Sequence, residues 1–253
     1  MTRKIGFMIL IYLIPLLLAG PVYGENQKIK KISLQTGVRF DYNHSEIVVN
    51  ENEDQNINYS FALIEAQLNF YRILSLGIMV GYNSTEYPHA INFQQLPLSL
   101  QMNGETFHSV AWGVKITTGA LTWNRFSLSA YGQMMKVESS EKEMEIQLPI
   151  VFGIAKPEAS FTQYDLQLQL RYRWLRKLSL YLGPQVHFID GSLDIYESVY
   201  ALSGNQHLHF EQSKTLGLTT GINYSFSPHF ELAINAVFFS KTGISMDLFI
   251  TFE

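Results

Sequence analysis

Three side chains that can bind metal ions or protons recur at every second position between residues 207 and 211. His207, His209 and Glu211 share one parity, and residues of one parity on a β-strand point to one face. A symmetric hairpin centred near residue 198 would set His187 opposite His209, with all four side chains on the inward parity. Imidazole and carboxylate groups gathered in this way could hold Zn²⁺ or another divalent ion, or change charge near neutral pH. The competing interpretation is ordinary polar residues at the mouth of the fold, and no cofactor is expected.

Charged side chains of both signs form a second group, on the parity opposite to the large apolar residues. We expect this group to line the interior of the fold, either as a polar network that bridges its wall or as a narrow path for solutes. A symmetric hairpin about residues 156–158 would place Glu143 beside Arg171, and a small shift in register would place Glu145 there instead. The expected lumen-lining residues are Arg39, Glu65, Lys115, Glu143, Glu145, Asp165, Arg171, Arg173, Glu231 and Asp247.

We expect these residues to lie on β-strands, because apolar and polar residues alternate at every second position through almost the whole chain from Ile32 onward. From residue 166 to residue 174, for example, Leu, Leu, Leu, Tyr and Trp alternate with Gln, Gln, Arg and Arg. Such alternation indicates strands with one apolar and one polar face. The clearest segments are 32–41, 62–70, 74–82, 110–116, 126–134, 166–174, 178–188, 216–226, 230–238 and 244–252.

Two further segments, 95–102 and 143–154, each contain a proline in the similar phrases QLPLSL and QLPIVF. Proline cannot donate to a strand ladder, which argues against a central strand, whereas the continued alternation argues for one. A closed barrel with both chain ends on one side needs an even number of strands, so both segments are accepted or both are rejected.

Accepting both gives an all-β fold, a closed antiparallel transmembrane β-barrel of 12 strands. The alternative is 10 strands with two long extracellular loops. We favour 12 because short links, such as the Asn103-Gly104 turn, then alternate with long ones. Short turns on one side and longer loops on the other are typical of outer-membrane barrels, and Asn-Gly between alternating runs indicates a hairpin.

The apolar face of these strands is expected to contact lipid. Charged residues make up 16% of the chain, against about a quarter in ordinary soluble domains. Tyr172, Trp174, Tyr224 and Phe252 fall at corresponding ends of their segments, as an aromatic girdle at a membrane surface requires. Strands in hydrocarbon must pair every backbone N–H and C=O, so only a closed sheet is stable there.

The C-terminal segment carries Lys241, Gly243, Met246 and Leu248, and it ends with Phe252 followed by Glu253. This pattern of a polar residue, a glycine and spaced hydrophobic residues resembles the closing strand of the bacterial outer-membrane β-barrel superfamily. Such barrels commonly end on phenylalanine, and the additional glutamate departs from that pattern. The resemblance implies the cell outer membrane of a Gram-negative bacterium, contact with outer-membrane lipid, and recognition of the C-terminal strand by barrel assembly machinery.

The same resemblance implies a small-solute channel or passive transporter, porin-like, with a charged and narrow lumen. The alternative is a non-conducting structural or surface-binding barrel that acts through its extracellular loops, above all Asn43–Asn56 and Asp190–Gln206. The first of these loops is acidic, and we expect it to be a solvated tip without regular structure.

The N-terminus has the organisation of a secretory signal, with Arg3 and Lys4 ahead of the apolar run Ile5–Ala19. Small residues at Val22 and Gly24 predict cleavage after residue 24. We therefore expect a signal peptide at residues 1–24 and one barrel domain at residues 25–253. The chain has no cysteine, which excludes a lipoprotein anchor, disulfides and thiolate metal sites.

Composition argues against several other functions. The net charge of −4 makes nucleic acid an improbable partner, and no glycine-rich phosphate loop leads from a strand into a helix. A lipid hydrolase needs serine, histidine and an acid within hydrogen-bond reach, and the outward parity offers little of this chemistry. We therefore expect no enzymatic activity.

Overall fold

The computed structural model describes residues 32–49, 53–70, 74–86, 90–92, 99–101, 106–119, 121–147, 152–199 and 202–252. The predicted signal peptide, residues 1–24, and the predicted turn Asn103-Gly104 lie outside these ranges. Among the described residues, no helix is long and apolar enough to cross a membrane.

Antiparallel strands account for almost all of the described chain. Their bounds are β1 Ile32–Val49, β2 Glu53–Phe70, β3 Leu74–Glu86, β4 Ala90–Asn92, β5 Ser99–Gln101, β6 Thr106–Thr118, β7 Leu121–Trp123, β8 Phe126–Glu141, β9 Met144–Gln147, β10 Phe152–Arg173, β11 Leu178–Val199, β12 Leu202–Gln212, β13 Leu216–Ser227, β14 Phe230–Phe238 and β15 Lys241–Phe252.

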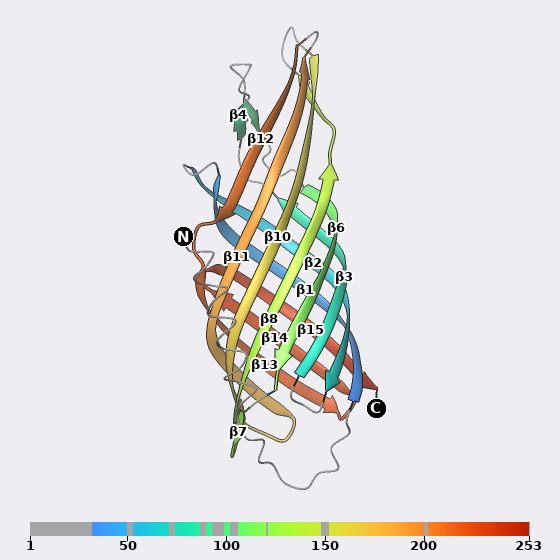
Figure 1. The fold of residues 1–253 in the computed structure, drawn as a ribbon, viewed down its shortest axis with the longest axis vertical. Helices are drawn as coiled ribbons and strands as arrows, with labels where there is room; N and C mark the ends of the chain where they lie inside the picture. The colour runs from blue at the N-terminus through green and yellow to red at the C-terminus, as the bar shows by residue number, and fades with distance from the viewer. Residues whose placement is uncertain are drawn as a thin grey trace.

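Ten of these strands form a closed ring in the order β1, β2, β3, β6, β8, β10, β11, β13, β14 and β15. The ring closes between the first and last strands, where Leu34 pairs with Phe252 and Tyr42 with Ile244. Figure 1 shows these strands crossing the barrel at an oblique angle. Every ring strand has a neighbour on each side, so the wall has no open edge, as a sheet in hydrocarbon requires.

The ring confirms the closed antiparallel barrel, and its ten members correspond to the alternative count rather than to twelve. The segment around Pro97 contributes β4 and β5, which pair only with each other. The segment around Pro149 contributes β9, a four-residue strand beside the first residues of β10. Of the described residues in these two segments, those of β5 and β9 stay outside the ring, and Phe152 begins the ring strand β10.

One end of the barrel carries tight connections. Asn124 and Arg125 form the turn between β7 and β8, and Asn124 adopts the left-handed conformation with φ of 53°, which asparagine tolerates in hairpin turns. The segment 174–177 joins β10 to β11, and residues 228–229 join β13 to β14. Both terminal strands, β1 and β15, have their chain ends here. Short turns identify this end as the periplasmic one.

The two faces of the wall exchange character partway along the strands. In the periplasmic half, apolar side chains point outward and are exposed, such as Ile64 and Ile78, which are 64% and 65% exposed. In the other half, buried apolar residues point inward. Strand β2 shows both changes. Its outward residues are polar at first and then apolar: Asn56, Asn58 and Ser60, followed by Ala62, Ile64 and Leu68. Its inward residues are apolar at first and then polar: Ile57, Tyr59, Phe61 and Leu63, followed by Glu65, Gln67 and Asn69.

This exchange marks the surface of the membrane. The lipid-facing half must be apolar outside, whereas a half surrounded by water needs polar residues outside and a dry core. Trp112 lies at the boundary on β6, where its indole N–H donates to Glu138 Oε1 at 2.7 Å. This hydrogen bond lowers the pKa of the exposed Glu138 carboxyl. Tryptophan with one apolar and one polar side is typical of membrane interfaces.

Strands β10, β11 and β12 rise above this boundary as an extension of the barrel (Figure 1). There β12 takes the place of β13, β14 and β15 between β11 and β1, pairing Ser192 with His209 on one side and Val48 with Glu211 on the other. Eight strands therefore contribute to the wall of the extension. A barrel of about eight strands has an interior that side chains alone can fill.

The predicted extracellular loops are therefore largely strand. Residues 43–49 belong to β1 and residues 53–56 to β2, paired from Asn43 with Tyr59 to Val49 with Glu53. Likewise, most of the range Asp190–Gln206 lies in β11 and β12. The expectation of an unstructured acidic tip is wrong for the described part of Asn43–Asn56, because Ile47 and Ile57 face a dry interior there.

Gln212 fastens the extension to the ring. Its side-chain Nε2 donates to the backbone oxygen of Ser240 at 2.5 Å and to that of Lys214 at 2.9 Å. Ser240 belongs to the turn that ends the β14–β15 hairpin, where Phe239 has φ of 77°. The chain thus runs from β12 past the end of the β14–β15 hairpin and enters the ring as β13.

Two arginine substitutions on β3 test the position of the boundary. Ile78 and Ser84 both point outward, six residues apart on one strand. Ile78→Arg places a cation in hydrocarbon and is expected to lower the free energy of unfolding by about 2–4 kcal/mol. Ser84→Arg places it in water and is expected to change that free energy by less than about 0.5 kcal/mol. Urea titration in lipid vesicles measures both; equal losses would contradict the assigned boundary.

Candidate functional site

A network of charged side chains crosses the interior at the level of the membrane. Arg39 Nε lies 2.9 Å from Asp41 Oδ2 and 3.5 Å from Asp247 Oδ1, and its Nη1 lies 3.8 Å from Glu65 Oε1. Lys115 forms a buried ion pair with Glu65. These residues come from β1, β2, β6 and β15, so the network ties together strands on both sides of the ring closure.

Neutral side chains extend this network to β8. Arg39 Nη1 donates to Gln133 Oε1 at 2.8 Å and to the Tyr131 hydroxyl at 3.1 Å. Gln133 lies directly between Lys115 and Asp165 in the register of β6, β8 and β10. A buried charge is stable when it is paired and when its remaining donors and acceptors are satisfied. Arg39 is paired in this way with carboxylates on β1, β2 and β15 and with neutral acceptors on β8.

A second group lies above the first and is centred on Asp165. This carboxylate accepts from Gln163 Nε2 at 2.6 Å and from Gln185 Nε2 at 2.7 Å. His187 Nδ1 lies 2.8 Å from its Oδ1, and Lys241 Nζ lies 3.2 Å from the same oxygen. All five side chains are buried.

The Asp165 group meets the apolar interior of the extension at His187. The Nε2 of this fully buried imidazole lies 3.2 Å from the Tyr59 hydroxyl, which in turn lies 3.3 Å from Ser45 Oγ. Tyr59 thus places its hydroxyl against polar groups and its ring among apolar ones. Burial raises the pKa of Tyr59 well above its ordinary value, which keeps this hydroxyl neutral.

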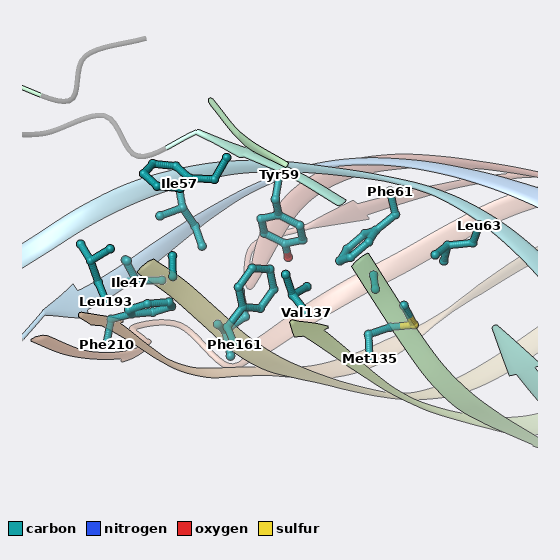
Figure 2. Close-up of a cluster of buried hydrophobic side chains, with 14 of the residues drawn as sticks. Ile47, Ile57, Tyr59, Phe61, Leu63, Met135, Val137, Phe161, Leu193 and Phe210 are labelled. Atoms are coloured by element: carbon teal, nitrogen blue, oxygen red, sulfur yellow. The ribbon is translucent and has the colours of Figure 1, made fainter. Parts of the chain in front are cut away.

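A dry apolar core fills the lumen beyond Tyr59. Its aromatic rings come from strands on opposite sides of the barrel, and Figure 2 shows them converging. The ring centroids of Tyr59 and Phe161 lie 5.8 Å apart, and those of Phe161 and Phe210 lie 6.5 Å apart. The core comprises Ile47, Ile57, Tyr59, Phe61, Leu63, Met79, Phe107, Ala111, Met135, Val137, Ala155, Ala159, Phe161, Ile189, Leu193, Ile195 and Phe210, each at most 6% exposed.

Below this core, a polar cavity of about 280 Å³ remains in the lumen. Its lining runs from Asp165 and Lys241 to Gln35 and Arg171 near the periplasmic end. The described interior therefore consists of a polar cavity on the periplasmic side and an apolar seal on the extracellular side.

Seven of the ten predicted lumen-lining charges face the interior. Arg39, Glu65, Lys115 and Asp247 belong to the network, Asp165 is the centre of the second group, and Arg171 and Glu231 line the cavity. Arg173 is exposed at the periplasmic end of β10.

The predicted positions of Glu143 and Glu145 are wrong. Both are exposed: Glu145 lies in β9, where it pairs with Ile154 in register, and Glu143 precedes β9 and lies 3.4 Å from Lys156. Arg171 lies instead beside Ser127 and Tyr181, near the periplasmic end. The described part of β9 pairs only with Phe152–Ala155, at the extracellular end of β10. Arg171 lies near the opposite end of β10, out of reach of Glu143 and Glu145.

The predicted inward cluster of His207, His209 and Glu211 is also wrong. These three residues point outward and are exposed, because the faces exchange above the membrane surface. His209 pairs with Ser192 rather than His187, and His207 Nδ1 lies 2.6 Å from Asp194 Oδ1. The described residues contain no group of three or more histidine, aspartate or glutamate side chains that could hold a metal ion.

Sequence reasoning missed Asp41, Tyr131 and Gln133 in the network and Lys241 in the Asp165 group. Asp41 and Lys241 have the parity of Arg39 and Asp247 on their own strands, so parity could have found them. The apolar core also has a sequence signal, since Ile57, Tyr59 and Phe61 alternate with Asn58 and Ser60, and their parity is opposite to that of the lipid-facing run that follows.

The closed ring, its exposed apolar belt and its polar interior decide the class of protein. The chain is a β-barrel of the outer-membrane type. No family model and no curated protein sequence matches it.

Several solved structures resemble this chain at low sequence identity. The outer membrane protease OmpT from Escherichia coli is 12% identical, with 91% of this chain and 97% of that chain covered and a TM-score of 0.40. The translocator domain of the autotransporter NalP from Neisseria meningitidis is 8% identical, with coverages of 99% and 96% and a TM-score of 0.45. The Ralstonia pickettii toluene transporter TbuX is 9% identical, with coverages of 93% and 92% and a TM-score of 0.35. No activity of these proteins is transferred to this chain.

Removing the charge of Asp165 is expected to destabilise the protein through its pair with Lys241. Asp165→Asn leaves the buried ammonium of Lys241 without its counter-charge, and removal of one partner of a buried pair costs about 3–5 kcal/mol. The free energy of unfolding in lipid vesicles is expected to fall by about that amount.

The matched control combines Asp165→Asn with Lys241→Met, which removes both charges. This double variant is expected to recover most of the lost stability. A single variant within about 0.5 kcal/mol of the wild type, or a double variant no better than the single one, would show that the two charges are not coupled.

Proposed function

We propose that this protein is a non-conducting outer-membrane barrel that presents a rigid β-sheet extension outside the cell for contact with a partner. The observation that supports this proposal is the apolar core between the polar cavity and the extracellular end. A channel was the predicted function favoured from sequence, and the non-conducting barrel was its alternative.

The apolar core argues against a solute path along the barrel axis. Tyr59, Phe61, Phe161 and Phe210 are each at most 3% exposed and come from three different strands, β2, β10 and β12. Protein interiors packed in this way contain few spaces as large as a water molecule, and small apolar cavities stay dry. Hydrated ions or polar solutes would have to displace several aromatic rings at once.

The length of the extension argues for a role outside the membrane. Strands β10 and β11 each contain 22 residues, about twice the 9–11 that cross a bilayer. The additional residues form paired strands with their own dry core instead of flexible loops. Exposed tyrosine and charged side chains lie on the outer surface, including Tyr196, Asp194 and His207. An ordered surface loses little conformational entropy on binding.

Planar-bilayer recording tests the proposal. The purified wild-type protein is expected to give no stepwise currents in bilayers where a reference porin, reconstituted in parallel, gives them. The physical reason is that the core excludes water from the extracellular half of the lumen.

Variants of the lumen distinguish a true channel from leakage around the protein. Arg39→Gln and Lys115→Gln change charges on the only polar stretch of the described interior, and both are expected to be as silent as the wild type. Stepwise wild-type currents whose amplitude or ion selectivity changes in these variants would overturn the proposal in favour of a channel.

A further inference from the structure

Two periplasmic turns lie side by side on the outer rim of the barrel. The first joins β7 to β8 through Asn124 and Arg125, and the second joins β10 to β11 through residues 174–177. The backbone N–H of Arg173 donates to the backbone oxygen of Arg125 at 2.8 Å, which fixes the two turns relative to each other. Figure 1 shows β7 at the end of the barrel opposite the extension.

Positive charge gathers at these turns. Arg125, Arg173, Arg176 and Lys177 are all exposed, and the stretches 121–127 and 172–179 contain no aspartate or glutamate. Lys177 Nζ donates to the backbone oxygen of Phe226 at 3.1 Å, whereas no carboxylate of the described residues pairs with the three guanidinium groups. At the opposite end, the extension exposes acidic residues such as Asp190, Asp194 and Glu211.

Aromatic rings surround the same two periplasmic turns. Trp123 stacks on Phe126 with a centroid distance of 6.1 Å, and Phe126 lies 5.0 Å from Tyr172. An open depression of about 630 Å³ is lined by Asn124, Arg125, Phe126 and Tyr172. The left-handed Asn124 sets the geometry of the turn that carries Arg125.

The lipid-facing wall begins next to the depression, two residues from Phe126 on β8 and from Tyr172 on β10. Leu128 and Leu170, the next outward residues on β8 and β10, pair with each other and belong to the apolar belt. Trp174, which follows β10 at the start of the second turn, is 56% exposed. Exposed tryptophan and tyrosine are favoured at the level of lipid headgroups, and arginine binds phosphate oxygens through two parallel hydrogen bonds.

We propose that this rim is a binding site for the phosphate headgroup of an anionic phospholipid in the periplasmic leaflet. Arg125 binds the phosphate in the depression, Arg173 and Arg176 add positive charge at the rim, and the aromatic rings pack against the glycerol and the upper acyl chains. A soluble phosphate would use the guanidinium groups alone, so the aromatic wall and its continuity with the belt favour a lipid.

The chain's three tryptophans allow a direct test. Trp112→Phe leaves only Trp123 and Trp174, both at the site. The full-length protein with this substitution is placed in vesicles of phosphatidylcholine that contain equal fractions of either brominated phosphatidylglycerol or brominated phosphatidylcholine. Bromine quenches tryptophan emission on contact, so the ratio of the two quenching constants reports the preference for the anionic lipid.

The ratio is expected to be about two or more, because a basic residue near an anionic surface favours that lipid about fivefold. Arg125→Gln, Arg173→Gln and Arg176→Gln together are expected to bring the ratio to about one. The control, Lys156→Gln with Lys214→Gln, removes positive charge at the end of the molecule opposite the periplasmic turns and is expected to keep the wild-type ratio. Unchanged quenching by brominated phosphatidylcholine shows that each variant is still embedded in lipid.

Two results would overturn the proposal. A ratio near one in the protein with intact arginines shows no preference for the anionic headgroup, and a ratio that survives the triple substitution shows a preference that does not arise from this site. Excess inorganic phosphate is the third arm: if it abolishes the preference while sodium chloride of equal ionic strength does not, the site takes soluble phosphate and the lipid assignment is wrong.

Discussion

Hydrocarbon cannot accept or donate hydrogen bonds, and the rest of this structure depends on that constraint. It forces the strands to pair around a closed ring, because an open edge in the bilayer would leave backbone groups unsatisfied. It also requires the outer face of the ring to be apolar. Once the strands leave the membrane, water imposes the reverse pattern, and the same strands carry polar residues outside and a packed apolar core inside.

The two halves meet at the buried groups around Asp165 and Tyr59. Ions at this depth are costly unless they are paired, and the lumen meets that cost with the Lys241–Asp165 pair and with amide donors from Gln163 and Gln185. Tyr59 completes the junction, because its hydroxyl reaches His187 while its ring joins the aromatic core. The structure therefore passes from a polar cavity to a dry seal within one or two layers of side chains.

The alternation of the sequence was sufficient to predict the barrel, its lipid-facing belt and most of its lumen charges. Parity placed Arg39, Glu65 and Lys115 inside, and the structure agrees. Parity could not say at which height a strand leaves the membrane. His207 and His209 were therefore assigned to the wrong face, although the reversed alternation around Tyr59 and Phe61 shows the exchange in the sequence itself.

Strand count and register depend on contacts that no single segment contains. The two proline segments alternate as well as true ring strands do, yet their neighbours pair without them. The predicted contact of Glu143 with Arg171 assumed a symmetric hairpin between barrel strands, whereas β9 is a short branch at the extracellular end. The replacement of three strands by β12 in the extension follows from where the β14–β15 hairpin ends, which is a tertiary feature.

Cysteine labelling along β6 tests the exchange of faces most directly, because the natural chain has no cysteine. In lipid nanodiscs, a water-soluble maleimide is expected to label His108→Cys, which is outside the extension, and Thr117→Cys, which lines the cavity. It is expected not to label Val114→Cys, which faces lipid, or Ala111→Cys, which lies in the apolar core and is 0% exposed. Labelling of Ala111→Cys as fast as Thr117→Cys would place water throughout the lumen and contradict the sealed barrel.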